Sequence, residues 1–570
     1  MKILDVQDLT ISFLSDTAQA PVVRNVSFSL QKGETLGIVG ESGSGKTVTC
    51  LSVLRLLDNN ARYRSGSIQY IKEPDSQPKD MLNLDRESLR KIRGREISII
   101  FQEPMSALNP VLTCGYQIIE VLKAHNVVPK EQYHPYTAEW LLKVGIDDPV
   151  RVMRSYPHQL SGGQLQRVLI AMALCTHPSI VIADEPTTAL DVSLQKKIMD
   201  LLKQLKLELG ISLILISHDL SMIKNSCDRI MVMNQGAVVE LAENDYIFYK
   251  SEQAYTKGLI NSKPPLDKKL KRLPTVSDFM QGRSLKSFYD DTMVISPQEQ
   301  DRKISDKSEI PKILEARNLN VKYITKRNFF GRPAKIFEAL KDVSFDLKQG
   351  EVLGLVGESG SGKSTLGKAL VNLVSIDEGR LFYQNLDITD LDESGWKTLR
   401  KEIQIIFQDP YSALNPRKSV AQSIMEPMEV HRLYNDTKGR LEKTEDLLKS
   451  VGLDGSYLSR FPHQLSGGQR QRICIARALA LNPKLLILDE SVSALDVSVQ
   501  AQVLNLLMDL KDKLCLSYLF ISHDFPAVHF MADRIMVMNH GKIVESGPAY
   551  KIISDPVDNY TKKLIESIPS

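Results

Sequence analysis

The fold of this 570-residue chain is decided by Gly40-Glu-Ser-Gly-Ser-Gly-Lys46-Thr47 and by its near copy Gly357-Glu-Ser-Gly-Ser-Gly-Lys363-Ser364. Each stretch follows a short apolar run and precedes a helical pattern, the context in which a glycine-rich loop binds phosphate. Its glycines let successive backbone N–H groups converge on the β- and γ-phosphates, and the next helix adds the partial positive charge of its N-terminus. The lysine neutralises phosphate, and the hydroxyl of Thr47 or Ser364 reaches Mg²⁺. The sequence therefore predicts two phosphate loops.

The similarity between the two halves extends well beyond these loops. Leu160-Ser-Gly-Gly-Gln164 recurs as Leu465-Ser-Gly-Gly-Gln469, and the offset of 305 residues between these copies also relates Asp184 to Asp489. Self-similarity at a fixed offset indicates a duplicated domain. The first copy carries an insertion of about ten residues, Glu73 to Asp80, which is expected to be a solvated loop.

Short apolar runs alternate with helical patterns in each copy. In the first copy these runs are Thr35–Val39, Ile97–Phe101, Ile180–Ala183 and Leu213–Ile216. Continuous apolar runs of this length are typical of strands buried on both faces of a parallel sheet. We expect an α/β fold with two P-loop domains, each built on a mainly parallel core sheet.

Prolines and charges mark the boundary between the copies. Prolines at 264, 265, 274, 297 and 311 disfavour a continuous helix, so this interval is expected to be a partly extended domain tail and linker. Its basic cluster, Lys268, Lys269, Lys271 and Arg272, is expected to be a solvated face, with nucleic-acid or lipid binding as the alternative. The expected domains are a first cassette at 1–262, an extension and linker at 263–312, and a second cassette at 313–570 with a short C-terminal extension.

Composition excludes several classes of protein. The chain is 42% hydrophobic and 25% charged with a net charge of +3, which suits globular domains and gives no sign of a dominant basic surface. Its six cysteines are far apart and offer no neighbouring pair for zinc or an iron–sulfur cluster, and a disulfide framework is not expected. The N-terminus lacks the apolar core of a signal peptide, and no apolar run approaches the 18 to 20 residues or so that span a bilayer. We expect a cytosolic chain that forms no transmembrane path.

Two apolar runs end in paired carboxylates, Asp184-Glu185 and Asp489-Glu490. The end of a buried strand is a rigid mount, so Asp184 and Asp489 can hold Mg²⁺ while Glu185 and Glu490 polarise the water that attacks the γ-phosphorus. A helix N-cap is the alternative role for such acids. The upstream phosphate loops favour catalysis.

Together, the phosphate loop, Leu-Ser-Gly-Gly-Gln, the strand ending in Asp-Glu and a later Ser-His resemble the nucleotide-binding domain of ABC ATPases, present twice and covering nearly the whole chain. The resemblance implies helical and antiparallel subdomains beside each core sheet. It also implies that each ATP, with Mg²⁺, lies between the phosphate loop of one copy and the Leu-Ser-Gly-Gly-Gln signature of the other. Site one would join Lys46 to the signature at Ser466, and site two would join Lys363 to the signature at Ser161.

The resemblance assigns residues to three roles. The implied nucleotide-binding residues are Phe13, Gly40, Glu41, Ser42, Gly43, Ser44, Gly45, Lys46, Thr47, Ser161, Gly162, Gly163 and Gln164 in the first copy. In the second copy they are Tyr323, Gly357, Glu358, Ser359, Gly360, Ser361, Gly362, Lys363, Ser364, Ser466, Gly467, Gly468 and Gln469. The implied metal site consists of Thr47, Gln102, Asp184, Ser364, Gln408 and Asp489, and the implied catalytic residues are Glu185, Glu490, His218 and His523.

Phe13 and Tyr323 match the aromatic residue that stacks on adenine, although an aromatic near a strand end is also common in cores. Asp191 and Asp496 match a loop that couples the two sites. Two departures from the family pattern are mild: Leu165 replaces a basic residue after the first signature, and Ser491 replaces a proline after Glu490. Neither site looks degenerate, so both are expected to hydrolyse ATP.

Two further segments resemble the importers of dipeptides, oligopeptides and nickel. They are Gln102 to Pro110 with its copy Gln408 to Pro416, where the family docks its permease, and the extensions at Ala254 to Pro264 and Asn559 to Pro569. The resemblance implies a fused pair of ATPase subunits, peripheral on the cytoplasmic face of the inner membrane, that energises import of peptides or related small solutes. Its partners would be two permeases and a solute-binding protein, with no nucleic acid and no iron–sulfur cluster. The alternatives are import of a nickel chelate or glutathione, a soluble tandem ABC ATPase on ribosomes or DNA, and the ATPase pair of an exporter.

Overall fold

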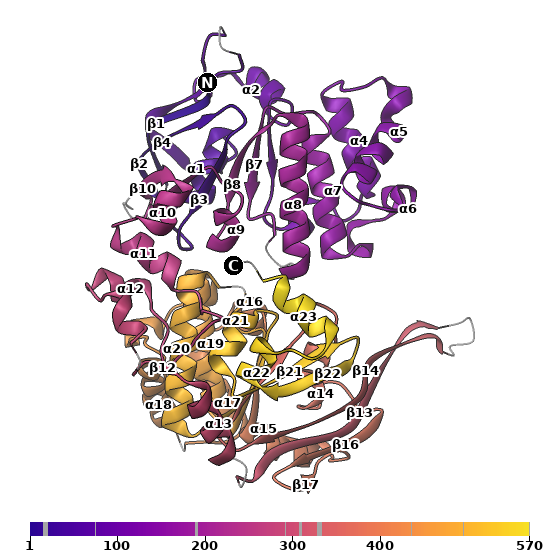
Figure 1. The fold of residues 1–570 in the computed structure, drawn as a ribbon, viewed down its shortest axis with the longest axis vertical. Coiled ribbons are helices and arrows are strands. Elements are labelled where there is room, and N and C mark those ends of the chain that lie inside the picture. The colour runs from indigo at the N-terminus through magenta and orange to yellow at the C-terminus, as the bar shows by residue number, and fades with distance from the viewer. Residues whose placement is uncertain are drawn as a thin grey trace. The chain divides into compact units, whose positions relative to one another are not determined.

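The computed structural model describes residues 1–14, 21–73, 76–187, 192–290, 292–306, 310–327, 333–434, 436–493 and 495–568. Over these residues the chain divides into two compact units, Met1–Ile260 and Asn261–Ile568 (Figure 1). Each unit contains one six-stranded and one four-stranded sheet with helices packed around them. Within the described ranges, every helix is too short or too polar to cross a bilayer.

The first unit is built on a six-stranded sheet in the order β10-β9-β3-β8-β7-β6, in which only β10 is antiparallel. A separate antiparallel sheet has the order β2-β1-β4-β5. The strands are β1 (Lys2–Phe13), β2 (Val23–Gln31), β3 (Thr35–Val39), β4 (Ala61–Tyr70), β5 (Lys79–Asp80), β6 (Ile97–Ile100), β7 (Ile180–Asp184), β8 (Ser212–Ile216), β9 (Arg229–Asn234) and β10 (Ala237–Glu243).

The helices of the first unit include a group, α4 to α6, that lies to one side of the sheets in Figure 1. The helices are α1 (Lys46–Val53), α2 (Arg86–Ile92), α3 (Pro104–Ala107), α4 (Cys114–Ala124), α5 (Tyr133–Lys143), α6 (Pro149–Arg154), α7 (Gly162–Leu174), α8 (Val192–Leu209), α9 (Leu220–Lys224), α10 (Asn244–Tyr249) and α11 (Ala254–Asn261).

The second unit repeats this plan, with a six-stranded sheet in the order β18-β19-β20-β15-β21-β22 and an antiparallel sheet in the order β14-β13-β16-β17. The hairpin of β13 and β14 is longer than its counterpart and extends away from the rest of the unit (Figure 1). The strands are β11 (Lys269–Leu270), β12 (Val294–Ile295), β13 (Lys312–Arg327), β14 (Pro333–Lys348), β15 (Val352–Val356), β16 (Glu378–Tyr383), β17 (Leu386–Asp387), β18 (Ile403–Ile406), β19 (Leu485–Asp489), β20 (Ser517–Ile521), β21 (Arg534–Asn539) and β22 (Lys542–Pro548).

The helices of the second unit include two, α12 and α13, that have no counterpart among the described helices of the first. The helices are α12 (Val276–Met280), α13 (Pro297–Asp306), α14 (Lys363–Ala369), α15 (Glu393–Glu402), α16 (Pro410–Ala413), α17 (Val420–Val430), α18 (Thr437–Ser450), α19 (Gly467–Leu479), α20 (Val497–Leu514), α21 (Phe525–Met531), α22 (Ala549–Ser554) and α23 (Asn559–Glu566).

The four apolar runs of the first copy form strands of the parallel sheet, which confirms the predicted α/β architecture. All five residues are buried in β3, β7 and β8 alike, because both faces of the sheet are covered. On one face, side chains of these strands pack in a hydrophobic cluster with residues of β1, β2, β4 and α1. The expected loop insertion differs in one respect: its last two residues, Lys79 and Asp80, form β5 by pairing with the end of β4. The equivalent β17 of the second unit pairs with β16 in the same way.

The segment from 263 to 306 is packed on the second unit. Leu270 and Leu273 are buried in the hydrophobic cluster that also contains α20 and α21. The side chain of Asn505 on α20 accepts a hydrogen bond from the backbone N–H of Leu273 at 2.9 Å and donates one to its carbonyl at 2.9 Å. Asn505 itself is only 4% exposed. These two buried hydrogen bonds fix the segment to α20.

The basic cluster of this segment is solvated only in part. Lys268, Lys271 and Arg272 are exposed, as expected, but Lys269 is buried. Its ammonium donates a hydrogen bond to the carbonyl of Ala532, directly after α21. The expectation was wrong for Lys269 because charge spacing does not reveal that a carbonyl at the end of a helix lies close enough to accept a hydrogen bond from this side chain.

We predict that Asn505→Asp loosens the segment, because a carboxylate opposes the Leu273 carbonyl and loses the donated hydrogen bond. Hydrogen exchange of the full chain should then show backbone amides at 264–280 exchanging at least about tenfold faster. The matched control is Asp200→Asn, at the equivalent and exposed position of α8. Equal exchange at 264–280 in Asn505→Asp and in the unmodified chain would contradict the prediction.

Candidate functional site

The phosphate loop of the first unit joins the carboxyl end of β3 to the start of α1. Gly40 has a positive φ, and a Cβ atom there would lie 2.2 Å from the backbone oxygen of Met233 on β9. Gly357 in the second unit would meet the backbone oxygen of Met538 on β21 at the same 2.2 Å. Each loop therefore lies directly against the strand next to its own, and only glycine fits at its first position.

The lysine of each loop is buried and folds over the loop backbone. Lys46 Nζ donates hydrogen bonds to the carbonyl oxygens of Gly40 at 2.7 Å and Glu41 at 3.0 Å. Lys363 Nζ donates to Gly357 at 2.8 Å and Glu358 at 2.9 Å. Both amines thus sit at the concave side of a loop rich in backbone N–H groups, where an anion would be neutralised.

The loop serines supply a test of whether a phosphate fits. Ser44 is 3% exposed and Ser361 is 5% exposed. Neither hydroxyl has a hydrogen-bond partner within the described part of the chain. Buried hydroxyls are nearly always paired, so two orphaned ones at equivalent loop positions fit a bound phosphate oxygen.

The hydroxyl that follows each lysine contacts the aspartate at the end of the neighbouring strand. Thr47 Oγ1 donates to Asp184 Oδ1 at 3.3 Å, and Ser364 Oγ donates to Asp489 Oδ1 at 2.9 Å. Burial raises the pKa of Asp184 to about 6, and the charge of Glu185 adds to this effect while the Thr47 hydrogen bond opposes it. Burial likewise raises the pKa of Asp489. A hydroxyl beside a desolvated carboxylate fits Mg²⁺, because a hard cation would stabilise the charged carboxylate.

The glutamates that follow these aspartates each receive two side chains from other elements. Gln102 Nε2 donates to Glu185 Oε2 at 2.7 Å, and His218 Nδ1 lies 3.1 Å from the same oxygen. In the second unit Gln408 Nε2 donates to Glu490 Oε2 at 2.7 Å, and His523 Nδ1 lies 3.3 Å from it. The structure therefore brings together the glutamine, glutamate and histidine of each copy.

Both glutamates adopt a backbone conformation that the sequence gives no sign of. Glu185 has φ 47° and Glu490 has φ 46°, in the left-handed region that non-glycine residues rarely adopt. Such a conformation costs on the order of 1 kcal/mol or more and persists where the surroundings enforce it. Here the backbone N–H of Glu185 donates to the Ile216 carbonyl at 3.0 Å, and that of Glu490 donates to Ile521 at 2.9 Å.

Opposing effects set the ionisation of the second glutamate. Burial acts to raise the pKa of Glu490, but its hydrogen bond to His523 and the charges of His523 and Lys363 outweigh burial and hold the pKa below its usual value. Lys363 Nζ lies 3.8 Å from Glu490 Oε1. Burial alone would lower the pKa of His523, but the hydrogen bond and charge of Glu490 raise it. Glu490 is therefore held as a carboxylate at neutral pH.

The signatures begin α7 and α19 and lie outside this hydrogen-bond network in the described residues. Ser161 caps α7 by accepting from the Gln164 N–H, and Gln164 accepts from the Ser161 N–H in return, each at 3.3 Å. Ser466 and Gln469 form the same capping box on α19. In this structure the glutamines and serines therefore stabilise the helix starts.

The signature glycines have a packing role that the sequence analysis missed. A Cβ atom at Gly163 would lie 2.4 Å from the Leu194 side chain on α8, and one at Gly468 would lie 2.3 Å from Val499 on α20. Ser161 and Gly162 are exposed and Gly163 is buried. The second glycine thus permits close approach of two helices, while the residues before it remain accessible.

The predicted adenine-stacking residues lie on strands of the antiparallel sheets. Phe13 is the last residue of β1 and pairs with Ala61 on β4. Tyr323 on β13 is opposite Phe337 on β14, and the two are 39% and 53% exposed. Of the two coupling aspartates, Asp496 is at the N-cap of α20, and Asp191 lies outside the described residues.

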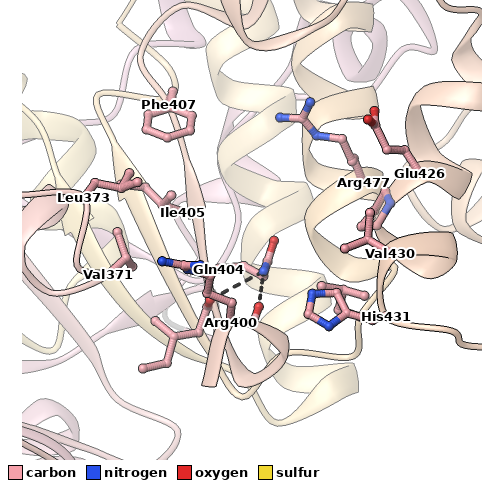
Figure 2. Close-up of a pocket in the computed structure, with 13 residues that line it drawn as sticks. Val371, Leu373, Arg400, Gln404, Ile405, Phe407, Glu426, Val430, His431 and Arg477 are labelled. Atoms are coloured by element: carbon pink, nitrogen blue, oxygen red, sulfur yellow. Dashed lines mark hydrogen bonds between the residues drawn. The ribbon is translucent and has the colours of Figure 1, made fainter. Parts of the chain in front are cut away.

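A groove in the second unit opens beside the residue that precedes Gln408. It has a volume of about 370 Å³ and is lined by Phe407, by residues of β18 and by residues of α17 and α19 (Figure 2). Val430, Pro427 and Ile405 give it apolar walls. Arg477, which also lines it, donates a hydrogen bond to the Ala413 carbonyl of α16 at 2.6 Å.

Comparison with known proteins agrees with this geometry. The family model for ABC transporter matches residues 23–188 and 340–493, more than half of the chain. The chain belongs to the ABC transporter family. Its two units are ATP-binding cassettes of an ATPase. A second family description, the oligopeptide/dipeptide transporter C-terminal region, matches residues 239–283 and 544–570.

Relatives span the whole chain. The glutathione import ATP-binding protein GsiA of Shigella dysenteriae serotype 1 (strain Sd197) is 43% identical over 100% of this chain and 89% of its own length. GsiA of Escherichia coli (strain K12) is 42% identical with the same coverage. A solved structure, the dimeric MJ0796 bacterial ABC transporter cassette, is 28% identical over 41% of this chain and 98% of that chain, with a TM-score of 0.38.

We predict that Gly40→Ala weakens ATP binding by the first cassette at least tenfold, because the new methyl group would displace the phosphate loop from β9. Equilibrium dialysis with radiolabelled ATP measures this in the full chain. The control is Gly210→Ala, which also has a positive φ but open space around its Cβ position. If Gly40→Ala binds ATP as the control does, the close approach to β9 does not shape the loop.

Proposed function

We propose that this chain is the ATP-hydrolysing subunit that energises import of peptides or related small solutes through separate transmembrane permeases. The observation that carries the proposal is the phosphate loop with its Gln-Glu-His cluster, built twice in one chain whose full length matches importer ATPases. The proposed location is the cytoplasmic face of the inner membrane, held there by the permeases and served by an extracytoplasmic solute-binding protein.

The contacts of each cluster support specific roles. Lys46 and Lys363 neutralise the β- and γ-phosphates, and Thr47, Asp184 and Gln102, with their copies Ser364, Asp489 and Gln408, hold Mg²⁺ or its water. Glu185 and Glu490 are proposed to polarise the attacking water, since each carboxylate is oriented by a glutamine and a histidine. His218 and His523 are proposed to contact the γ-phosphate. When bound, Mg²⁺ would neutralise charge that develops on the phosphates.

The signatures are proposed to complete the nucleotide site of the opposite cassette, as the family resemblance implies. The capped starts of α7 and α19 present Ser161 or Ser466 with free access to solvent, which suits a γ-phosphate brought from another domain. ATP would then favour the closed pair of cassettes. A shift from 1:99 to 99:1 needs about 5.5 kcal/mol of differential affinity, about half from each nucleotide if they contribute equally.

Both sites should contribute to turnover, because the two clusters have nearly the same geometry. Glu185→Gln and Glu490→Gln should each lower hydrolysis at the altered site by about a hundredfold, since an amide cannot polarise water as a carboxylate does. The summed rate of the full chain should then fall to about half if the two sites turn over independently, and further if they are coupled. Release of inorganic phosphate measures the rate. An unchanged rate in either single variant would exclude hydrolysis at that site.

We propose that the permeases dock at α3 and α16, which follow the glutamines of the two clusters. Met105 on α3 and Tyr411 on α16 occupy equivalent positions, and both are exposed, at 51% and 55%. The groove of Figure 2 lies next to α16 and has mostly apolar walls. An apolar helix of a permease fits this surface, and a shift of α16 would reach Glu490 through Gln408.

Met105→Glu with Tyr411→Glu should prevent copurification of multi-spanning permeases with the tagged chain from detergent-solubilised membranes of its host. ATP hydrolysis by the isolated chain should change less than twofold, because neither side chain is a member of the Gln-Glu-His clusters. Mass spectrometry identifies the copurifying proteins. If the double variant retains the permeases, they dock elsewhere. If the unmodified chain copurifies with ribosomal or DNA-repair proteins and no permeases, the transport proposal is overturned.

Glutathione is the second candidate solute, since the relatives that match the full chain at 42% and 43% identity are glutathione import ATP-binding proteins. Glutathione is itself a small peptide, so it belongs to the proposed class. Uptake of labelled glutathione and of labelled dipeptides, in competition, by membrane vesicles that contain the chain and its copurified permeases distinguishes the two solutes.

A further inference from the structure

Each phosphate loop receives a tyrosine hydroxyl from the C-terminal extension of its own copy. The backbone N–H of Glu41 donates a hydrogen bond to Tyr255 Oη at 3.1 Å. In the second copy the N–H of Glu358 donates to Tyr560 Oη at 2.9 Å. The two contacts join residues 214 and 202 positions apart, so the sequence gives no local reason for either. Because the same hydrogen bond occurs in both copies, it is a regular feature of how the extension contacts the loop.

The extension helices that carry these tyrosines are anchored to the core sheet by equivalent glutamates. On β10, Glu240 Oε2 accepts hydrogen bonds from the hydroxyls of Ser251 and Thr256, both at 2.7 Å. On β22, Glu545 accepts from the backbone N–H groups of Val557 at 2.8 Å and Asp558 at 3.1 Å. The groups that reach the glutamate differ between copies, but in both the start of the extension helix is fixed to the same strand.

Both contacts are shielded in part from water. Tyr255 is only 4% exposed, and Tyr560 packs against the hydrophobic cluster of the second unit. A hydrogen bond from a partly buried backbone N–H is stronger than one in water, and Tyr→Phe would remove its acceptor. The hydroxyl therefore holds the first turn of the loop at a defined place.

The contact leads directly to the lysine that binds phosphate. The residue whose N–H bonds the tyrosine is the residue whose carbonyl accepts from the lysine: Glu41 for Lys46 at 3.0 Å, and Glu358 for Lys363 at 2.9 Å. A single loop residue, Glu41 or Glu358, thus links the extension to the lysine ammonium group. Moving the tyrosine would move this carbonyl and with it the start of the loop.

We propose that Tyr255 and Tyr560 are positioning residues for ATP binding, through which each C-terminal extension sets the conformation of the phosphate loop in its own cassette. The inference rests on the proposed nucleotide-binding role of the two loops. It assigns the extension a function in the ATPase itself. Because the extension is held by the core sheet, it pre-orders the loop and lowers the cost of binding nucleotide.

The test uses the full chain with Glu185→Gln and Glu490→Gln, so that ATP binds without being hydrolysed. Tyr255→Phe removes one hydroxyl and keeps the ring, and Tyr560→Phe does the same in the second copy. Calorimetric titration with Mg-ATP should show one of the two sites weakened about three- to tenfold in each single variant and both weakened in the double variant. Tyr249→Phe, on the exposed end of α10, is the control.

Thermal unfolding of the same variants separates positioning from a general structural role. The expected result is a site-selective loss of affinity with a melting temperature within about 2 °C of the parent. If the double variant binds ATP like the parent, or if either single variant weakens both sites equally along with the melting temperature, the inference is overturned. Hydrolysis and solute uptake by the unmodified chain test the proposed function separately, since neither enters this binding measurement.

Discussion

The close approach of the phosphate loop to the neighbouring parallel strand is the constraint on which each cassette depends. Gly40 against Met233 and Gly357 against Met538 leave no room for a side chain. With the loop fixed there, the helix that follows starts at the buried lysine, and the next residue meets the aspartate at the end of another strand. The central sheet therefore places the loop hydroxyl within hydrogen-bonding reach of an aspartate that lies 137 residues away in the first copy and 125 in the second.

Duplication preserved these polar contacts and let the surrounding surface diverge. The Gln-Glu-His clusters agree within a few tenths of an ångström, because a change in one partner would orphan the others. The residues of α20 and of its counterpart α8 do not belong to these polar clusters, and they differ between the copies. Asn505 is buried beneath the segment from 263 to 306, whereas Asp200 at the equivalent position is exposed. A carboxylate is tolerated only where no carbonyl covers it.

The sequence predicts the parallel strands, the phosphate loops and the paired carboxylates because these are local patterns with a fixed spacing. Glu185 and Glu490 were identified by such a pattern, yet their left-handed backbone is imposed by the adjacent strand and has no local signal. The burial of Lys269 and the reach of Tyr255 to the loop depend on contacts across more than 200 residues. From sequence alone, a charged residue or a tyrosine in an extension is expected to be exposed, and only the tertiary structure shows which residues bury it.

The segment from 263 to 306 determines where this polypeptide can be divided. Residues 264 to 306 contribute buried leucines and an ammonium group to the second unit, so a fragment starting at 313 would expose the apolar face of α20 and α21 to water. Exposed apolar patches of this kind promote aggregation. A gene split that yields two separate chains would keep the second chain folded only if the break fell near residue 261, ahead of the prolines.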